Sequence, residues 1–171
     1  MHDLQKIYRM VLEDICSVGI IYGNIKSISA KEGDYADVAR CNRTEKKTFG
    51  FVISTTFDIE VSEWLLEDDV PEQSLKDIVA HEVLHTCEGC FDHTGTWKEY
   101  AMLMNRTLGY HIARTTKNID LGNYTPKYKY AVQCSSCGGV VPRRYETKVI
   151  KHPEKYTCPY CNKEKVLVRI K

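Results

Sequence analysis

The sequence predicts an α+β protein in which helices pack on a roughly three-stranded antiparallel sheet and a small cysteine-rich domain follows. Two observations predict this division. Segments with helical spacing of apolar residues flank a stretch rich in alternating and β-branched residues, and two C-x-x-C pairs lie near the C-terminus. A chain of 171 residues suffices for one core of moderate size and a small accessory domain. We expect the first domain over residues 1–124 and the second over residues 125–171.

The first domain is expected to begin with a helix and a sheet. Apolar residues recur at helical spacing over residues 4–15, which predicts an amphipathic helix. Residues 20–57 change character, because turn residues there separate short extended segments. We expect about three antiparallel strands in this stretch, at residues 25–29, 36–44 and 49–56.

Three further helices are expected before the domain boundary. The first is short, over residues 60–66, and the second covers about residues 72–88. The third covers about residues 94–109, where apolar side chains again share one helical face. Residues 120–130 show no clear periodicity, so we expect a linker there and a boundary near Tyr124.

The most informative segment is His81-Glu82-Val83-Leu84-His85, on the second of these helices. Residues four apart lie about 40° apart around a helix, so both imidazoles face one direction and can bind one metal ion. Glu82 lies about 100° from His81, where its carboxylate can take a proton from a reacting water. The alternative is a helix whose histidines cap or pack, because so short a pattern also arises by chance.

A third ligand is expected at His93. A catalytic zinc ion usually takes three protein ligands and leaves a fourth position open. Gly89 can end the helix and turn the chain back, and a returning helix would hold His93 over the metal. Asp92 is the alternative third ligand.

The second domain contains Cys134, Cys137, Cys158 and Cys161, which form two C-x-x-C pairs separated by twenty residues. Each pair is typical of a tight knuckle, and two knuckles complete a tetrahedral site of four thiolates for a structural zinc ion. A domain this small needs its metal to fold. Two disulfides are the alternative in an oxidising environment. Strands of a zinc ribbon are expected at residues 140–141, 143–145 and 148–150.

The charge of the chain is divided unequally between the two domains. From Tyr124 onward there are eleven Lys and Arg against three Asp and Glu, although the whole chain has a net charge of only +1. A basic domain beside an acidic one favours a polyanion partner, most plausibly single-stranded DNA, and a solvated surface is the alternative. The side chains expected to contact nucleic acid are cations interleaved with aromatic rings: Arg143, Arg144, Tyr145, Lys148 and Tyr156.

Taken together, these motifs resemble the SprT-like (Spartan-type) zinc metalloprotease family over most of the chain. The matching elements are His81-Glu82-x-x-His85, His93-x-x-x-Trp97-Lys98, Asn105, Gly109-Tyr110-x-Ile112-x-Arg114, the four ribbon cysteines, and Tyr156 before the second knuckle.

The resemblance implies a small zincin-like metalloprotease domain followed by a zinc ribbon. It implies two Zn²⁺ ions, a catalytic one held by His81, His85 and His93 and a structural one in the ribbon, with Glu82 as the catalytic acid/base. Its implied activity is hydrolysis of peptide bonds in proteins bound or crosslinked to DNA, with the ribbon binding the DNA. Tyr110 is a candidate for steadying the oxyanion.

Cys87 and Cys90 depart from the general pattern of this family. They form another C-x-x-C pair between the second and third expected metal ligands. Small apolar residues packing under the site are the favoured interpretation. A redox-sensitive or metal-inhibitory switch is the alternative.

Two rival functions remain open from the sequence. One is a non-catalytic DNA-binding protein with a structural zinc ion on the helix, and the other is a soluble peptidase without a DNA role. The chain has no run of apolar residues that would predict a membrane span. Its cysteine pattern and its N-terminal residues favour the cytoplasm. The oligomeric state is not predicted.

Overall fold

The computed structural model describes residues 1–32, 38–115, 120–122 and 128–171. The chain divides into two compact units, Met1–Tyr124 and Thr125–Lys171. Residues 123–127 of the expected linker over residues 120–130 lie outside the described residues. No helix of the described segments has both the length and the apolar character needed to cross a membrane.

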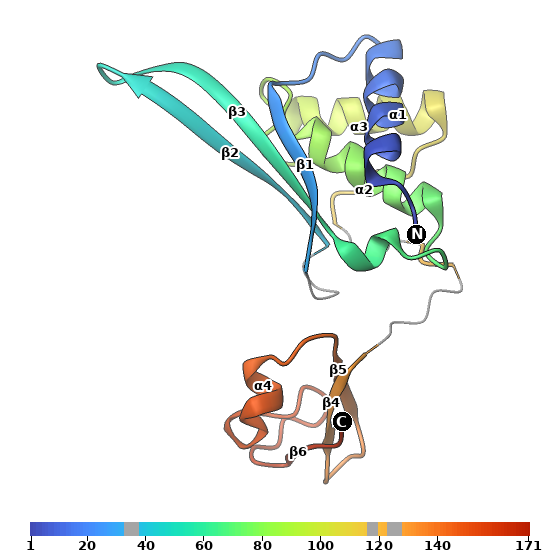
Figure 1. Ribbon diagram of the computed structural model, residues 1–171, viewed down its shortest axis with the longest axis vertical. Coiled ribbons are helices and arrows are strands. Elements are labelled where there is room, and N and C mark those ends of the chain that lie inside the picture. Colours follow the sequence, from blue (N-terminus) through green and yellow to red (C-terminus); the bar gives the residue numbers. More distant parts are fainter. Residues whose placement is uncertain (33–37, 116–119, 123–127) are drawn as a thin grey trace. The chain divides into compact units, whose positions relative to one another are not determined.

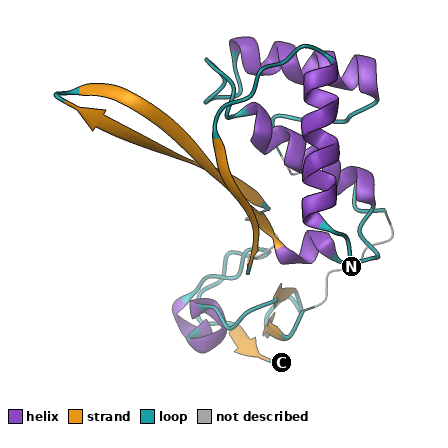
Figure 2. Cartoon of the chain, turned by 45° about the horizontal axis from the view of Figure 1, so that its top comes forward, coloured by secondary structure: helices purple, strands orange, loops and turns teal. Residues whose placement is uncertain are grey.

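The first unit packs its helices against a three-stranded sheet, so the expected α+β class is confirmed (Figure 1). Helix α1 (Leu4–Ser17) is followed by strands β1 (Ile25–Lys31), β2 (Ala39–Thr48) and β3 (Phe51–Ser62), the short 3-10 helix η1 (Glu63–Leu66), and helices α2 (Glu72–Leu84) and α3 (Gly95–Leu108). The helices lie on one side of the sheet (Figure 2).

The sheet is mixed, so the expectation of three antiparallel strands was wrong for β1. The strand order is β1-β3-β2, in which β1 runs parallel to β3 and β2 runs antiparallel to it. A tight hairpin joins β2 to β3, which makes that pair antiparallel. Strand β2 lies at the edge of the sheet, and β3 lies between β2 and β1. Strand β3 therefore returns from the hairpin turn in the same direction as β1. Alternation of side chains predicts a strand but not its direction.

A continuous apolar core fills the space between the helices and the sheet. Helix α1 begins where the Asp3 carboxylate accepts the Lys6 backbone N–H at 3.0 Å, and it buries one face along its length. Strand β3 continues to Ser62, further than expected, so only Glu63–Leu66 of the predicted short helix is helical. Each fully buried aliphatic side chain contributes about 1.5–3 kcal/mol. The main core residues of these elements are Ile7, Val11, Ile15, Ile59, Val61, Leu75, Val79 and Leu84.

The second unit is a smaller three-stranded sheet with short helical turns. Its elements are β4 (Tyr130–Cys134), β5 (Val140–Arg143), α4 (Lys148–Lys151), the 3-10 turn η3 (Pro153–Lys155) and β6 (Leu167–Arg169), and its strand order is β5-β4-β6. The strand expected at residues 148–150 was wrong, because these residues form α4. The helical turn buries Ile150 in the small core and leaves Lys148 exposed. Three residues are too few for their periodicity to distinguish a strand from a helical turn. Of the strand expected at residues 143–145, only Arg143 lies in a strand, because β5 ends there.

The β2–β3 hairpin extends away from the helices and ends in an unusual turn (Figure 1). Thr48 pairs with Phe51, so the turn has two central residues, and both have positive φ: 50° at Phe49 and 83° at Gly50. Two-residue turns of this kind favour Asn-Gly, since the first position strains a bulky side chain. Phe49 is 96% exposed, so packing does not compensate for this strain.

Phe49→Asn is therefore expected to stabilise the first unit. Asparagine tolerates the left-handed conformation, and the phenyl ring contributes no burial that would be lost. We expect a gain of about 1 kcal/mol, seen as a rise of about 2–4 °C in Tm by calorimetry. A lower Tm would show that the ring makes a stabilising contact in the folded protein.

Candidate metal centres

Helix α2 carries the first two histidines into the interior of the first unit. All residues from Ile78 to Leu84 are buried, which shows that the helix is enclosed on most of its circumference. His81 and Glu82 are among these buried residues, and His85 forms the C-terminal cap of the helix. Polar groups buried this deeply require partners, because an unpaired polar group in an apolar interior is costly.

A tight loop after α2 brings the third histidine back to the other two. The helix ends at Leu84, earlier than expected, and the chain then turns through Gly89 at a φ of 74°. The loop is held in place by Gly23, whose N–H donates to Thr86 Oγ1 at 3.0 Å. A side chain at Gly23 would collide with the Thr86 carbonyl, so glycine permits this close approach. His93 follows just before α3.

The three imidazoles converge through the same ring nitrogen. The Nε2 atoms of His81, His85 and His93 are separated by 3.3 Å (His81 to His85), 3.1 Å (His85 to His93) and 2.9 Å (His81 to His93). Four-coordinate zinc, with bonds of about 2.0–2.1 Å to nitrogen, separates two ligand nitrogens by about 3.3 Å. The three histidines therefore form a candidate metal-binding group whose geometry fits zinc.

Backbone carbonyls fix the orientation of two of these rings. The Nδ1 atom of His81 donates to the Ala113 carbonyl and that of His85 donates to the Cys90 carbonyl, both at 2.9 Å. A neutral ring that donates from Nδ1 presents an unprotonated Nε2 to a metal. Backbone carbonyls that accept from Nδ1 are common partners of histidine ligands. These two carbonyls accept from the outer side of the His81 and His85 rings, so they direct both Nε2 atoms toward a common point.

The carbonyl that holds His81 belongs to a segment fastened from two helices. Asn105 on α3 accepts the Ile112 N–H at 2.8 Å and donates to the Ile112 carbonyl at 2.9 Å. Asp77 on α2 accepts the His111 N–H at 3.0 Å. These bonds position residues 111–113 beside His81, so Asn105 acts on the site through the backbone.

Trp97, in the first turn of α3, packs against all three imidazoles. Its ring centroid lies 4.9 Å from that of His81, 5.7 Å from that of His85 and 4.7 Å from that of His93. The indole is buried, so it forms an apolar wall that keeps water from one side of the rings.

Burial keeps the three imidazoles neutral. Desolvation, followed by the neighbouring rings of His85 and His93, lowers the pKa of His81 to about 3. Desolvation also lowers the pKa of His85, and desolvation together with His85 lowers that of His93. Only a neutral imidazole can donate a lone pair to a metal, so the surroundings favour the binding form.

Glu82 is buried on α2, with 6% of its surface exposed. Its charge acts on Cys41 of β2, because desolvation first and then the Glu82 carboxylate raise the pKa of that thiol to about 12. The carboxylate is therefore close to β2, the outer strand of the described sheet. No sequence pattern indicated Cys41, whose position depends on the register of β2 with β3.

Three hollows open around the histidines, and each is lined by one of them. One of about 320 Å³ includes His81, one of about 530 Å³ includes His85, and one of about 550 Å³ includes His93. The hollow at His85 extends to Arg43, Thr55 and Phe57 on the β2–β3 hairpin. The site is thus open toward the sheet.

Several secondary candidates take other positions. Asp92 is exposed and bonded to the Thr94 N–H, and it is absent from the metal-binding group. Tyr110 is buried and its hydroxyl donates to Asp14 at 2.6 Å, so the phenol is engaged in the core instead of being available for an oxyanion. Cys87 and Cys90 are buried in the apolar core, as the packing interpretation expects, and desolvation raises the pKa of Cys87 to about 12.

The four cysteines of the second unit form the other candidate metal-binding group. The Sγ atoms of Cys134 and Cys161 are 3.7 Å apart, as are those of Cys137 and Cys158, and all four thiols are free. Tetrahedral zinc with bonds of about 2.3 Å to sulfur separates the sulfurs by about 3.8 Å. The distances fit this arrangement and are too long for disulfides.

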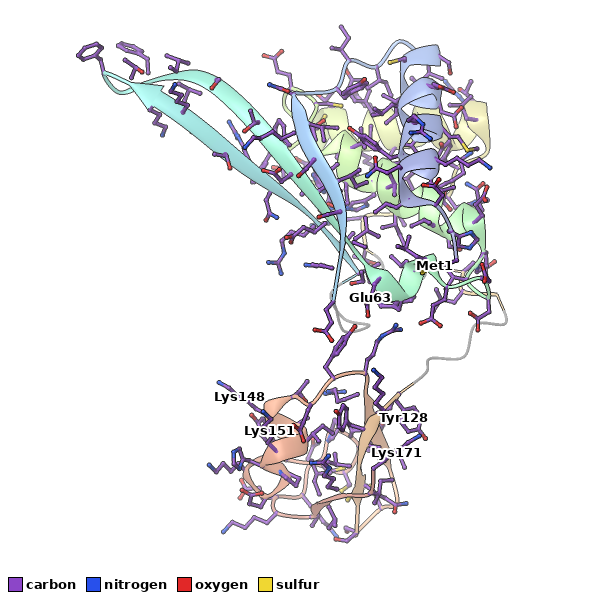
Figure 3. All side chains as sticks on the ribbon, viewed as in Figure 1. Met1, Glu63, Tyr128, Lys148, Lys151 and Lys171 are labelled. Atoms are coloured by element: carbon purple, nitrogen blue, oxygen red, sulfur yellow. The ribbon has the colours of Figure 1, made fainter. Side chains whose placement is uncertain are left out.

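The expected nucleic-acid contacts are spread over several elements of the second unit. Arg143 ends β5, Arg144 and Tyr145 follow it half-buried, and Lys148 begins α4. Figure 3 shows Lys148 and Lys151 projecting from α4, with Tyr128 and Lys171 on the strand side of the same unit. Tyr156, expected to stack on a base, is 38% exposed.

A second group of cations and rings lies on the strand side and was not indicated by the sequence. Lys171 lies over the ring of Tyr128 with Nζ 5.2 Å from its centroid, and Arg169 lies over Tyr130 with Cζ at 5.4 Å. These pairs join segments forty residues apart, which only strand pairing reveals.

No family model, curated protein or solved structure matches the chain.

Asn105→Ala is expected to weaken zinc binding at the histidine centre without removing a ligand. Loss of its two hydrogen bonds frees the segment that carries the Ala113 carbonyl, and supporting partners of this kind are worth about 10–100-fold in metal affinity. The measurement is competition for zinc with a chromophoric chelator, in which the cysteine centre serves as an internal control. Thr107→Ala, an exposed change on the same helix, should leave both affinities unchanged. Equal affinity in Asn105→Ala and the wild type would contradict this role.

Proposed function

We propose that the protein is a zinc-dependent endopeptidase of the SprT-like kind, which hydrolyses peptide bonds in proteins bound or crosslinked to DNA. The observation that carries the proposal is the convergence of three Nε2 atoms, with two Nδ1 atoms fixed by carbonyls, around a helix that also buries Glu82. Three neutral imidazoles that leave room for substrate are typical of a catalytic zinc site, whereas a structural site is usually closed by a fourth side chain.

Each residue has a separate part in the proposed reaction. His81, His85 and His93 hold the metal, and a zinc ion bound there supplies Lewis acidity that polarises a carbonyl and makes water more acidic. Glu82 accepts the proton of the attacking water as its oxygen bonds to the peptide carbon. The carboxylic acid then returns that proton to the nitrogen as the carbon–nitrogen bond breaks. Trp97 excludes water behind the rings.

The second unit is proposed to bind DNA, with single strands favoured, around a structural zinc ion. Support comes from its excess of Lys and Arg and from rings and cations at its surface. In this arrangement the ribbon selects substrates by location, because binding one strand raises the local concentration of any protein attached to it. Eight free thiols suit a reducing compartment, which supports a proposed location in the cytoplasm.

Two rival functions make different demands on the same residues. A non-catalytic DNA-binding protein needs the histidines but not the carboxylate of Glu82. A peptidase without a DNA role needs Glu82 but not the cations of the second unit. Separate substitutions in the two units therefore distinguish all three functions.

Glu82→Gln is expected to retain zinc and fold while losing cleavage, because the amide cannot accept the proton of the attacking water. The measurement is cleavage of a protein substrate by the full chain, with and without a single-stranded oligonucleotide, and we expect a loss of at least about 10³-fold. The control is Glu99→Gln, which removes an exposed carboxylate from α3. Cleavage that persists in Glu82→Gln would reject the mechanism.

The triple variant Arg143→Ala, Arg144→Ala and Lys148→Ala is expected to bind single-stranded DNA more weakly. Removing up to three phosphate contacts should reduce the slope of log affinity against log salt by about 2. Anisotropy of a labelled oligothymidine over a salt series measures both effects. Lys6→Ala, Arg9→Ala and Arg106→Ala together make the same change of charge on the first unit. Equal slopes in the two variants would favour the peptidase without a DNA role.

A further inference from the structure

The end of the β2–β3 hairpin exposes a group of apolar side chains that the proposed chemistry does not use. This hairpin tip consists of Phe49, Phe51, Val52 and Ile53, which are 96%, 76%, 47% and 56% exposed. Large apolar side chains gathered at one exposed place usually mark an interaction surface, whereas single ones need no explanation.

The fold does not require these side chains. The strands would pair equally well with polar residues at the tip, and Phe49 occupies a positive-φ position that asparagine or glycine fills with less strain. An aromatic ring that is both strained and fully exposed is better explained by a binding partner than by stability.

The side chains of the tip argue against a polyanion as the partner, because none of the four carries a charge. Below the tip, Glu45 pairs with Arg43 and, at 3.3 Å, with Lys47, so one carboxylate offsets part of the positive charge of Arg43, Lys46 and Lys47. Val52 and Ile53 are aliphatic and cannot stack on bases.

The stem connects the tip with the histidine centre along one strand. β3 is the only described strand that pairs with β2, so the other edge of β2 offers backbone donors and acceptors to an extended chain. At the inner end of β2, Cys41 interacts with Glu82, and Arg43 lies over the ring of Phe91 at 5.4 Å. The hollow at His85 is lined by Arg43 and Phe91.

We propose that the hairpin tip captures an apolar segment of an extended, unfolded polypeptide, whose continuation follows β2 into the histidine centre. The inference rests on the proposed function and names its substrate class: unfolded protein chains with an apolar cluster at a distance from the cleaved bond. Phe49 lies eight residues after Cys41 along β2 and its turn, which corresponds to about 26 Å of extended chain. In the substrate, the apolar cluster should therefore lie about eight residues from the scissile bond.

The test uses the full chain with Glu82→Gln, so that binding is measured without cleavage. The probe is fluorescently labelled α-lactalbumin that has been reduced and carboxymethylated, which keeps it unfolded. Adding Phe49→Asn and Phe51→Thr should raise the Kd in an anisotropy titration by about tenfold, because two phenyl rings are then no longer buried against the bound chain. Val168→Thr, which removes an exposed aliphatic side chain from the second unit, should leave the Kd unchanged. A Tm of the tip variant that is no lower than that of its parent excludes unfolding as the cause.

A second measurement separates this inference from the proposed function. With Glu82 restored, the tip variant should cleave the unfolded protein with a higher KM, but should cleave a six-residue peptide spanning a mapped cleavage site as the wild type does. Equal Kd values for the tip variant and its parent would overturn the inference and leave the proposed function standing. Tip-dependent binding without any cleavage by the wild type would instead refute the proposed function alone. Tip-dependent binding to oligothymidine or to phosphatidylserine vesicles, with the unfolded protein unaffected, would also overturn the inference.

Discussion

The first unit depends on one interaction for its chemistry, the donation of two histidine Nδ1 protons to backbone carbonyls. Ala113 accepts from His81 and Cys90 accepts from His85, so both rings present their Nε2 atoms to one point, where His93 joins them. Without these carbonyls, two imidazoles four residues apart on a helix would be free to rotate away from each other. The loop after α2 supplies the Cys90 carbonyl, and the segment after α3 supplies the Ala113 carbonyl.

The rest of the fold can be understood from that requirement. Helix α2 must be buried to desolvate the histidines, which explains its enclosure by apolar neighbours and the pKa of about 3 for His81. A buried helix must also end abruptly if its last histidine is to meet a ligand from the next segment, and the turn through Gly89 provides this. Asn105 and Asp77 complete the support from neighbouring helices. The cost of burying these polar groups is offset by hydrogen bonds, and a metal ion bound by the histidines would offset it further.

Spacing along the sequence indicated the donor atoms but not their support. Two histidines four residues apart share a face of any helix, and a glycine before His93 suggested a returning chain. All three histidines were therefore candidates from the sequence alone. Every residue has a carbonyl, so nothing in the sequence singled out Ala113 or Cys90 as acceptors. Long-range pairing also explains the wrong predictions: the direction of β1 depends on how the hairpin crosses the sheet, and residues 148–150 form a helical turn because Ile150 reaches the small core that way. Tyr110 was a candidate for steadying the oxyanion, whereas Asp14, ninety-six residues away, accepts its hydroxyl hydrogen.

The central claim is a metal ion bound by three Nε2 atoms, with one position open to solvent and substrate. A crystal structure of the zinc-loaded protein, with anomalous difference maps recorded on both sides of the zinc absorption edge, tests it most directly. We expect a zinc peak within about 2.0–2.1 Å of Nε2 of His81, His85 and His93, with no fourth protein atom bound. Coordination through Nδ1, or a side chain such as Asp92 or Cys41 in the fourth position, would contradict it.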